Sequence, residues 1–299
     1  MLALMARPIL LLVLLLSLAE ARAQTPAASP SAAPPDSPAP AATATPSPAA
    51  AAASGAAVTT SGTTSRVTFS HVNVDGPYIA MTFDDGPSAG STNNTNRLLD
   101  LAAKKHIKLT FFLIGENAAR YPKLVQRELA EGHEIGNHSY THPDLAKMSD
   151  AAVRSEIQKT QDAIINASGY RPTLMRPPYG AMTARQRQWV SQEWGFKIIL
   201  WEVDPLDWKE PGSDVVASRI ITATRPGDII LSHDIHSQTV DAMPKVFDAL
   251  LAQGYKFVTV SELIAMDKGP VTKPKKSPAK SAEAAASPFP LSKFAPQLE

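Results

Sequence analysis

Residues 78–87 read Tyr-Ile-Ala-Met-Thr-Phe-Asp-Asp-Gly-Pro, a strand-like run that ends in two adjacent carboxylates and a Gly-Pro turn. Burying a carboxylate without a partner is costly, because the loss of water disfavours its charged form. Two carboxylates at the end of a strand therefore indicate a bound cation or a catalytic task. On this stretch alone, the alternative that an aspartate only caps the next element stays equally open.

A pair of histidines, His138 and His142, follows Asn137 in the sequence HSYTH. Side chains four residues apart project to one side of a helical turn, so both imidazoles can reach one ion. Pro143 disfavours the α conformation at His142, which predicts a turn or a short helix here. The pair alone is a weak signal. Two histidines with one aspartate, leaving positions for water and substrate, are a common type of catalytic metal site.

Three further short segments follow in order, and each is unremarkable alone. They are RPPYG at 176–180, DPLDW at 204–208 and LSH at 231–233. Together with TFDDGP at 82–87 and HSYTH at 138–142, they make the chain resemble the polysaccharide deacetylase family, also called the NodB-homology domain or carbohydrate esterase family four. The resemblance extends to its peptidoglycan GlcNAc and chitooligosaccharide deacetylases. It covers residues 66–267, and all five motifs are intact.

This resemblance implies a metal-dependent hydrolase that removes acetyl groups from N-acetylated sugars. Its metal ligands would be Asp85, His138 and His142. They would hold one divalent ion, with zinc as the first expectation and cobalt or another divalent ion as alternatives. The ion would act as a Lewis acid and lower the pKa of its bound water toward about 7. The nucleophile would be water, so no covalent enzyme intermediate is expected.

The resemblance also implies roles for the other motif residues. Asp84 would be the general base, kept ionised and oriented by Arg176, because a nearby cation lowers the pKa of a carboxylate. His233 would protonate the leaving amine, with Asp207 raising its pKa. The metal and the backbone N–H of Tyr179 would stabilise the oxyanion. The apolar wall for the acetyl methyl would consist of Trp208 and Leu231.

Other nucleophiles and other histidines receive less weight. The chain has no cysteine, which argues against cysteine hydrolase chemistry. His133 precedes the strand-like segment before the histidine pair, and we interpret it as structural. His236 follows the last motif closely and could touch substrate, although a plain loop residue is the preferred interpretation. No role is assigned to His71 and His106.

The two ends of the 299-residue chain lack a globular composition. Residues 1–23 are predicted to be a secretory signal, with Arg7 in its n-region and Ala21-Arg22-Ala23 at the cleavage site. The apolar run is short for a membrane span, and an anchored, uncleaved form is the alternative. Residues 24–65 are predicted to be a disordered Ala/Pro-rich linker, and residues 268–299 a disordered tail rich in Lys, Pro and Ala.

The middle of the chain, residues 66–267, has the length of one catalytic domain. Strand-like segments are expected at 79–83, 109–114, 134–137, 174–176, 197–201, 228–232 and 257–260. Helices are expected at 121–131, 151–167, 184–194, 213–224 and 240–253. This alternation predicts an α/β fold with a parallel sheet. The family's distorted seven-stranded (β/α) barrel fits this count, and the motifs fall at strand ends, where barrel active sites gather.

These observations predict a secreted or periplasmic, cell-envelope enzyme that removes N-acetyl groups from a GlcNAc-containing polysaccharide. Peptidoglycan is the first expected substrate, chitin or chitooligosaccharide is the alternative, and acetylxylan ranks third. A non-catalytic glycan-binding domain ranks last, because it would need neither the metal set nor the acid–base pair. The net charge of +1 gives no case for nucleic acid. We expect a monomer without stable membrane insertion once the signal is cleaved.

Overall fold

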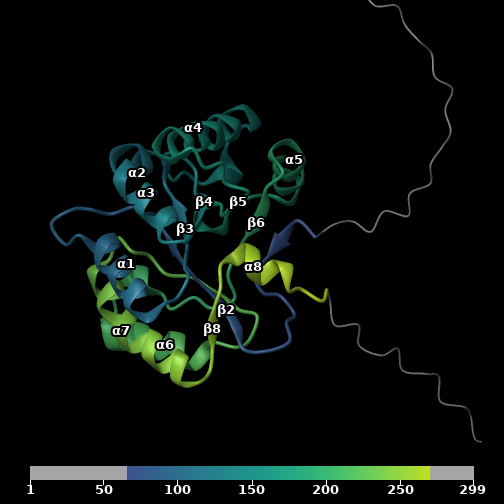
Figure 1. Cartoon of the computed structure of the whole chain (residues 1–299). Coiled ribbons are helices and arrows are strands. Elements are labelled where there is room, and N and C mark those ends of the chain that lie inside the picture. Colours follow the sequence, from purple (N-terminus) through teal and green to yellow (C-terminus); the bar gives the residue numbers. More distant parts are fainter. Residues whose placement is uncertain (1–65, 270–299) are drawn as a thin grey trace, which may run out of the picture. The chain divides into compact units, whose positions relative to one another are not determined.

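Strands and helices alternate along residues 66–269, the part of the chain that the computed structural model describes (Figure 1). The strands are β1 (Thr68–Phe69), β2 (Tyr78–Asp84), β3 (Thr110–Leu113), β4 (Glu134–Asn137), β5 (Leu174–Met175), β6 (Lys197–Ile199), β7 (Ile229–Ile230) and β8 (Lys256–Phe257). The α-helices are α1 (Asn94–Lys105), α2 (Gly115–Arg120), α3 (Pro122–Ala130), α4 (Asp150–Ser168), α5 (Ala184–Trp194), α6 (Ser213–Ala223), α7 (Ser237–Ala252) and α8 (Val260–Ala265). Short 3-10 turns lie at Leu145–Lys147, Pro178–Gly180 and Asp207–Lys209.

Every pair of strands in the sheet is parallel, as the alternation predicts. The order is β1-β6-β5-β4-β3-β2-β7, and β8 pairs with the start of β2. Seven of these strands match the expected segments, and β1 is the addition. The sheet does not close into a continuous ladder within residues 66–269. Isolated bridges from Val203 to Ile230 and from His71 to Asp228 join its two ends, so the fold is a distorted, open barrel.

The two faces of β2 show how the sequence builds this barrel. Ile79, Met81 and Phe83 pack into the large apolar cluster that the outer helices complete. Ala80 faces a second, inner cluster with Phe112 and other strand residues. Because side chains alternate along a strand, Thr82 and Asp84 share the inward face with Ala80. A strand covered on both faces reads as a nearly continuous apolar run, which is the pattern seen in 78–83.

Local signals explain several helix boundaries. Ser149 caps α4 by accepting a hydrogen bond from the Ala152 amide. Helix α5 has the expected bounds, and Thr183 and Gln186 form a reciprocal capping box at its start. Helix α1 was not predicted: its N-cap, Asn93, makes no side-chain cap hydrogen bond, so the usual start signal is missing.

The strand expected at 257–260 is wrong for most of its length. Strand β8 ends at Phe257, and Val260 is already the first residue of α8. The cause is a second capping box, in which Thr259 and Glu262 satisfy each other's backbone N–H groups and so start a helix.

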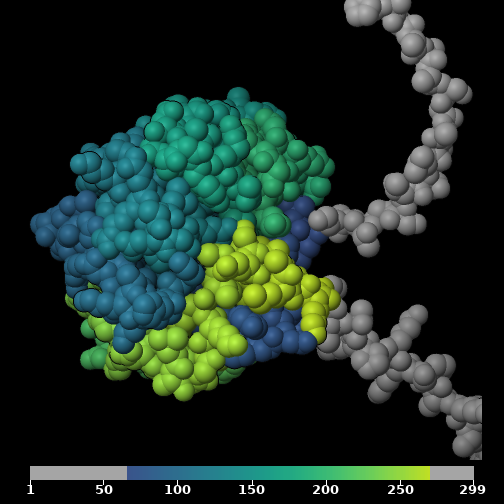
Figure 2. Space-filling model, in the orientation of Figure 1, coloured from purple at the N-terminus to yellow at the C-terminus, as the bar shows by residue number. Residues whose placement is uncertain are grey.

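The two ends of the described domain lie side by side. Arg66 forms an ion pair with Asp267 at 3.2 Å, and the Lys268 amide donates to the Asn73 carbonyl oxygen at 3.0 Å. Figure 2 shows the same neighbourhood as contact between the first and last coloured segments. Arg66 precedes β1, so this meeting point lies toward the amino ends of the parallel strands.

Three segments predicted from the sequence lie wholly or mostly outside residues 66–269. The predicted signal (1–23), the linker (24–65) and all but two residues of the tail (268–299) lie outside the described residues. Within residues 66–269, no helix combines the length and the apolar character needed to cross a membrane.

Candidate active site

The five motifs come together at the carboxyl edge of the sheet, because parallel strands all end on the same side. They surround a cavity of about 340 Å³. It is lined by Asp84, Asp85, His138, His142, Tyr179, Trp201, Asp204, Trp208, Leu231 and His233. Eight of the ten residues singled out from the sequence are in this lining. The other two, Arg176 and Asp207, are fully buried behind it.

Asp84 and Asp85 separate where β2 gives way to a turn. Asp84 keeps the inward direction of the strand, and Asp85 has a positive φ of 71°, which takes it out of the strand conformation. The Asn117 side chain donates to the Asp85 carbonyl oxygen at 2.7 Å and fixes the turn from outside. Two neighbouring carboxylates can therefore hold different positions, as the Gly-Pro turn after them predicts.

His138, His142 and Asp85 converge with ligand atoms within 4.8 Å of one another. The Nε2 atoms of both histidines lie 3.3 Å from Oδ1 of Asp85. Nδ1 of His138 lies 2.7 Å from the Arg176 carbonyl oxygen, so its N–H donates there and Nε2 keeps a free lone pair. A backbone carbonyl on the far nitrogen is the usual way in which proteins orient metal-binding histidines.

The electrostatics of this cluster favour a cation. Oδ1 of Asp85 is buried and has no hydrogen-bond partner. Burial alone would raise the pKa of Asp85, but the two imidazoles lower it to about 2. Burial likewise opposes charge on His138, yet the Asp84 and Asp85 carboxylates raise its pKa. An orphaned carboxylate oxygen facing two imidazole nitrogens at 3.3 Å is a donor set that suits zinc or a similar divalent ion.

The segment that carries the two histidines is a loop. The sequence predicts a turn or short helix here; residues 138–142 form a bent loop, which agrees with the turn and not with the helix. Ser139 and His142 both adopt positive φ, at 63° and 59°. The left-handed backbone at these two residues brings the imidazoles together, with ring centroids 5.0 Å apart. The two histidines therefore lie side by side as expected, but the cause is this loop and not a helical turn.

Asp84 is held by a buried arginine. Nη1 of Arg176 donates to Oδ1 of Asp84 at 2.6 Å and to the Thr82 hydroxyl at 2.7 Å. Nη2 donates to the Leu200 carbonyl oxygen at 3.1 Å, and the guanidinium stacks on the Phe112 ring at 4.2 Å. Such a fixed ion pair orients one carboxylate oxygen and leaves Oδ2 of Asp84 directed toward His138, 3.7 Å from its Nε2.

His233 and Asp207 form the second charged pair. Nδ1 of His233 lies 2.9 Å from Oδ1 of Asp207, and the His233 amide donates to Oδ2 at 2.8 Å. The Thr239 hydroxyl and the Trp208 amide complete the carboxylate's shell. Burial alone would lower the pKa of His233, but the hydrogen bond and charge of Asp207 outweigh it and raise the pKa to about 9. The imidazolium is thus the main form at neutral pH.

The rim of the cavity is partly apolar. Tyr179 and Trp208 are 69% and 50% exposed, so two large aromatic side chains stand at the opening. Leu231 is buried at its wall. The Tyr179 hydroxyl also lies 3.1 Å from Nδ1 of His142, which links the rim to the histidine pair.

Some residues at the site were not found from the sequence. Trp201 and Asp204 line the cavity. Asp204 stands inside a quoted motif, but nothing in its type distinguished it from a turn residue. Asp234 directly follows His233 and is fully buried, and burial raises its pKa to about 7. It accepts a hydrogen bond from the Thr95 hydroxyl, which in turn accepts one from the Ser88 amide at 2.7 Å.

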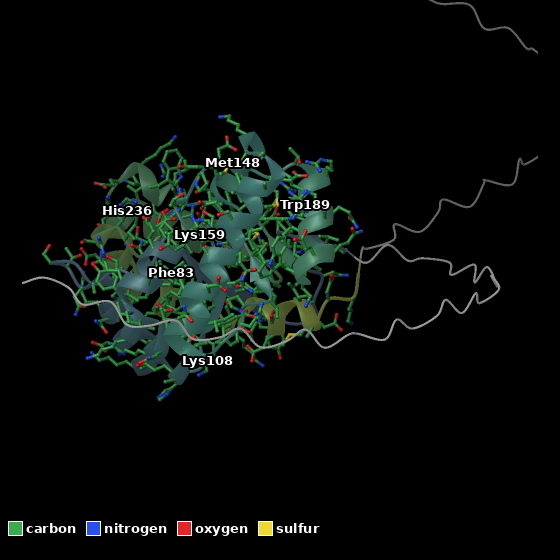
Figure 3. All side chains as sticks on the ribbon, turned by 90° about the horizontal axis from the view of Figure 1, so that it is seen from above. Phe83, Lys108, Met148, Lys159, Trp189 and His236 are labelled. Atoms are coloured by element: carbon green, nitrogen blue, oxygen red, sulfur yellow. The ribbon has the colours of Figure 1, made fainter. Side chains whose placement is uncertain are left out.

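The remaining histidines lie outside the cavity lining. His133 is buried, accepts a hydrogen bond from the Leu109 amide at 3.1 Å and packs on Phe111, which fits a structural role. His236, labelled in Figure 3, lies next to His233 with ring centroids 6.1 Å apart. His71 pairs with Asp228 at 2.9 Å.

Comparison with known proteins agrees with this geometry. The family described as Polysaccharide deacetylase matches residues 71–199. A Bacillus cereus peptidoglycan-N-acetylglucosamine deacetylase is 39% identical over 201 residues, covering 64% of this chain and 72% of that protein. Listeria monocytogenes peptidoglycan-N-acetylglucosamine deacetylase PgdA is 43% identical over 185 residues, covering 62% of this chain and 38% of that protein. The match thus spans well under half of the Listeria relative.

A solved structure extends the likeness to the fold. The structure of peptidoglycan deacetylase PdaC from Bacillus subtilis has 39% sequence identity and a TM-score of 0.60, and the match covers 65% of this chain and 93% of that one. Fold and site together define an α/β domain with a candidate metal centre at the carboxyl ends of its parallel strands. The chain belongs to the polysaccharide deacetylase family.

Proposed function

We propose that the protein is a metal-dependent N-deacetylase of the cell envelope that acts on the GlcNAc units of peptidoglycan. One observation carries this proposal. The orphaned Asp85 oxygen faces two imidazole nitrogens, and two charged pairs contribute to the same cavity, Asp84 with Arg176 and His233 with Asp207. The similarity to enzymes named peptidoglycan deacetylases supports the choice of polymer.

Asp85, His138 and His142 would hold one divalent ion, with zinc as the first choice. When bound, the ion would supply Lewis acidity for the acetyl carbonyl group. Asp84 would accept the proton of the attacking water. Its Oδ1 is held by Arg176, and its Oδ2 lies 3.7 Å from Nε2 of His138 in the lining of the cavity. General-base catalysis of this kind contributes about 10²–10⁴-fold to the rate.

His233 would act on the other side of the bond. The water oxygen bonds to the carbonyl carbon and the amide C–N bond breaks. The acetyl group is released as acetate, and the nitrogen takes a proton to leave as an amine. A histidine whose pKa is about 9 carries that proton at neutral pH. Asp207 would keep the imidazolium charged and oriented through its hydrogen bond at 2.9 Å.

The other motif residues would shape the acetyl subsite. The backbone N–H of Tyr179 would donate to the developing oxyanion, a type of contact whose loss costs about 10²–10³ in rate. Trp208 and Leu231 would form the wall against the acetyl methyl group. Residues 1–23 would direct export, which brings the domain to the wall polymer.

The test is acetate release by the purified protein on peptidoglycan and on chitooligosaccharide. We expect release from peptidoglycan that a chelator abolishes and added zinc restores. Asp84→Asn should keep stoichiometric zinc and lose about 10²–10⁴ of the rate, because it removes the base and leaves the three ligands in place. Unchanged acetate release by Asp84→Asn would contradict the base assignment.

The other outcomes separate the alternatives. Faster release from chitooligosaccharide than from peptidoglycan would replace the polymer but keep the chemistry. Release only from acetylated xylan would replace the amide substrate by an ester. A protein that binds no divalent metal and releases no acetate would be a glycan-binding domain that keeps the fold.

A further inference from the structure

A buried glutamate outside the five motifs contacts the loop that carries both histidines. Glu156 lies on α4 and is 8% exposed. Its Oε2 accepts hydrogen bonds from the Tyr140 and Thr141 amides, both at 2.8 Å. Its Oε1 accepts one from the Thr141 hydroxyl at 3.1 Å. All three donors belong to the short stretch between His138 and His142.

The same loop is held from a second side by the start of α2. The Gly115 amide donates to the Ser139 carbonyl oxygen at 2.9 Å, and the Glu116 amide donates to the Tyr140 carbonyl oxygen at 3.2 Å. Gly115 also allows a close approach, because a Cβ there would collide with the Tyr140 ring. Helix α2 thus binds the carbonyl groups of the loop, and Glu156 on α4 binds its N–H groups.

These contacts hold an unfavourable backbone conformation. Ser139 and His142 have φ values of 63° and 59°, which non-glycine residues adopt only when the surroundings require it. Within the loop, the Ser139 hydroxyl accepts from the His142 amide at 3.1 Å. Lys159, labelled on α4 in Figure 3, lies 5.7 Å from the centre of the Tyr140 ring. The conformation that turns His142 toward Asp85 therefore depends on partners outside the loop.

From this geometry we infer that Glu156 is a positioning residue of the metal centre, which acts by binding the backbone of the loop between the two histidines. The inference rests on the proposed metal site. Its carboxylate replaces the water that the Tyr140 and Thr141 amides would otherwise need, and so it stabilises the one loop shape that points both Nε2 atoms at Asp85. We expect the length of the side chain to matter more than its charge, because all three donors are neutral groups.

Two substitutions separate reach from charge. Glu156→Gln has the same length, and its amide oxygen can still accept from both backbone N–H groups while its NH₂ donates to the Thr141 hydroxyl. Glu156→Asp keeps the charge but is one methylene shorter, so its oxygens withdraw from the loop. Asp162→Ala, which removes an exposed carboxylate from the same helix without contact to the loop, is the matched control.

The measurements are zinc affinity by calorimetry and amide hydrogen exchange in the metal-free protein. We expect Glu156→Asp to weaken zinc binding about 10–100-fold and to speed exchange at Tyr140 and Thr141, as supporting contacts around metal ligands usually do. Glu156→Gln and Asp162→Ala should stay within a few-fold of the wild type in both. An equal or stronger loss in Glu156→Gln than in Glu156→Asp would overturn the inference. Exchange reports on the loop even if the wild type binds no zinc, an outcome that would refute the proposed function instead.

Discussion

Replacing Asp207 by asparagine should change the pH dependence of the reaction more than its maximum. Asp207 lies 2.9 Å from Nδ1 of His233 and is fully buried, so its charge acts in a medium with little water. The pKa of His233 is about 9 because this carboxylate outweighs the effect of burial. Without the charge, burial is opposed only by the more distant Asp84 and Asp85, and the pKa falls toward its ordinary 6.5 or below.

The size of the effect follows from the two pKa values. At pH 8, a group with a pKa of about 9 is about 90% protonated, whereas one with a pKa of 6.5 is about 3% protonated. The fraction of enzyme that carries the proton for the leaving amine therefore falls about 30-fold at pH 8. At pH 6 both forms are mainly protonated, and the same substitution should cost no more than about twofold through this route.

The assay is acetate release as kcat/KM from pH 5.5 to 9.5, with zinc held in excess. A direct reading is the imidazole chemical shift of His233 in the metal-free protein, followed by NMR over the same range. Asp204→Asn is the matched control. It removes a second carboxylate of the same motif, and this carboxylate also lines the cavity. Asp204 accepts a hydrogen bond from the Leu206 amide and makes none with His233.

The expected result is a basic limb that moves down by about 2.5 pH units in Asp207→Asn and stays in place in Asp204→Asn. An equal loss at every pH from 5.5 to 9.5, with an unmoved His233 titration, would refute the reasoning. In that case Asp207 would contribute only through its hydrogen bonds to the His233 amide and the Thr239 hydroxyl.

Two further predictions concern stability. Thr95→Val should lower the free energy of unfolding by about 1–3 kcal/mol in urea titrations, because it leaves the buried Asp234 carboxyl and the Ser88 amide without their shared partner. Thr95→Ser keeps the hydroxyl and should retain most of the stability. Equal stability of the Val and Ser variants would contradict this contact. His133 is neutral in the folded state, since burial lowers its pKa to about 4, while the unfolded chain takes up that proton below pH 6.5. Stability should therefore fall by about 3 kcal/mol between pH 6.5 and 4 through this residue, and His133→Gln should lose that part of the pH dependence; parallel curves for both proteins would exclude it.

The sequence predicted the sheet well because its strands are covered on both faces. Residues 78–83 read as apolar almost throughout, and such runs are hard to mistake for surface segments. Helix α1 was not predicted although its N-cap is an asparagine, and this asparagine makes no capping hydrogen bond. Helix α8 was missed because its first residue, Val260, is β-branched and favours a strand. At α8 the capping box of Thr259 and Glu262 decided the element, and composition does not record such a contact.

The same contrast holds at the site. Motif residues were found because their chemistry is rare and their order is specific. The residues that hold them in place, such as Glu156 and Asp234, were not found. A glutamate on a helix or an aspartate after a strand is ordinary in sequence, and only its burial and its partners distinguish it. The path of the loop between His138 and His142 was also out of reach, because its left-handed residues are stabilised by groups on two separate helices.

The contact between Arg66 and Asp267 has a consequence for engineering. The two ends of the domain meet near the amino ends of the strands, while the cavity opens at their carboxyl ends. A host protein could carry the domain as an insertion in one of its own loops, with two short connections, and the cavity would face away from the host. For the same reason, joining these ends and opening the chain at an exposed loop should give a circular permutant that still folds.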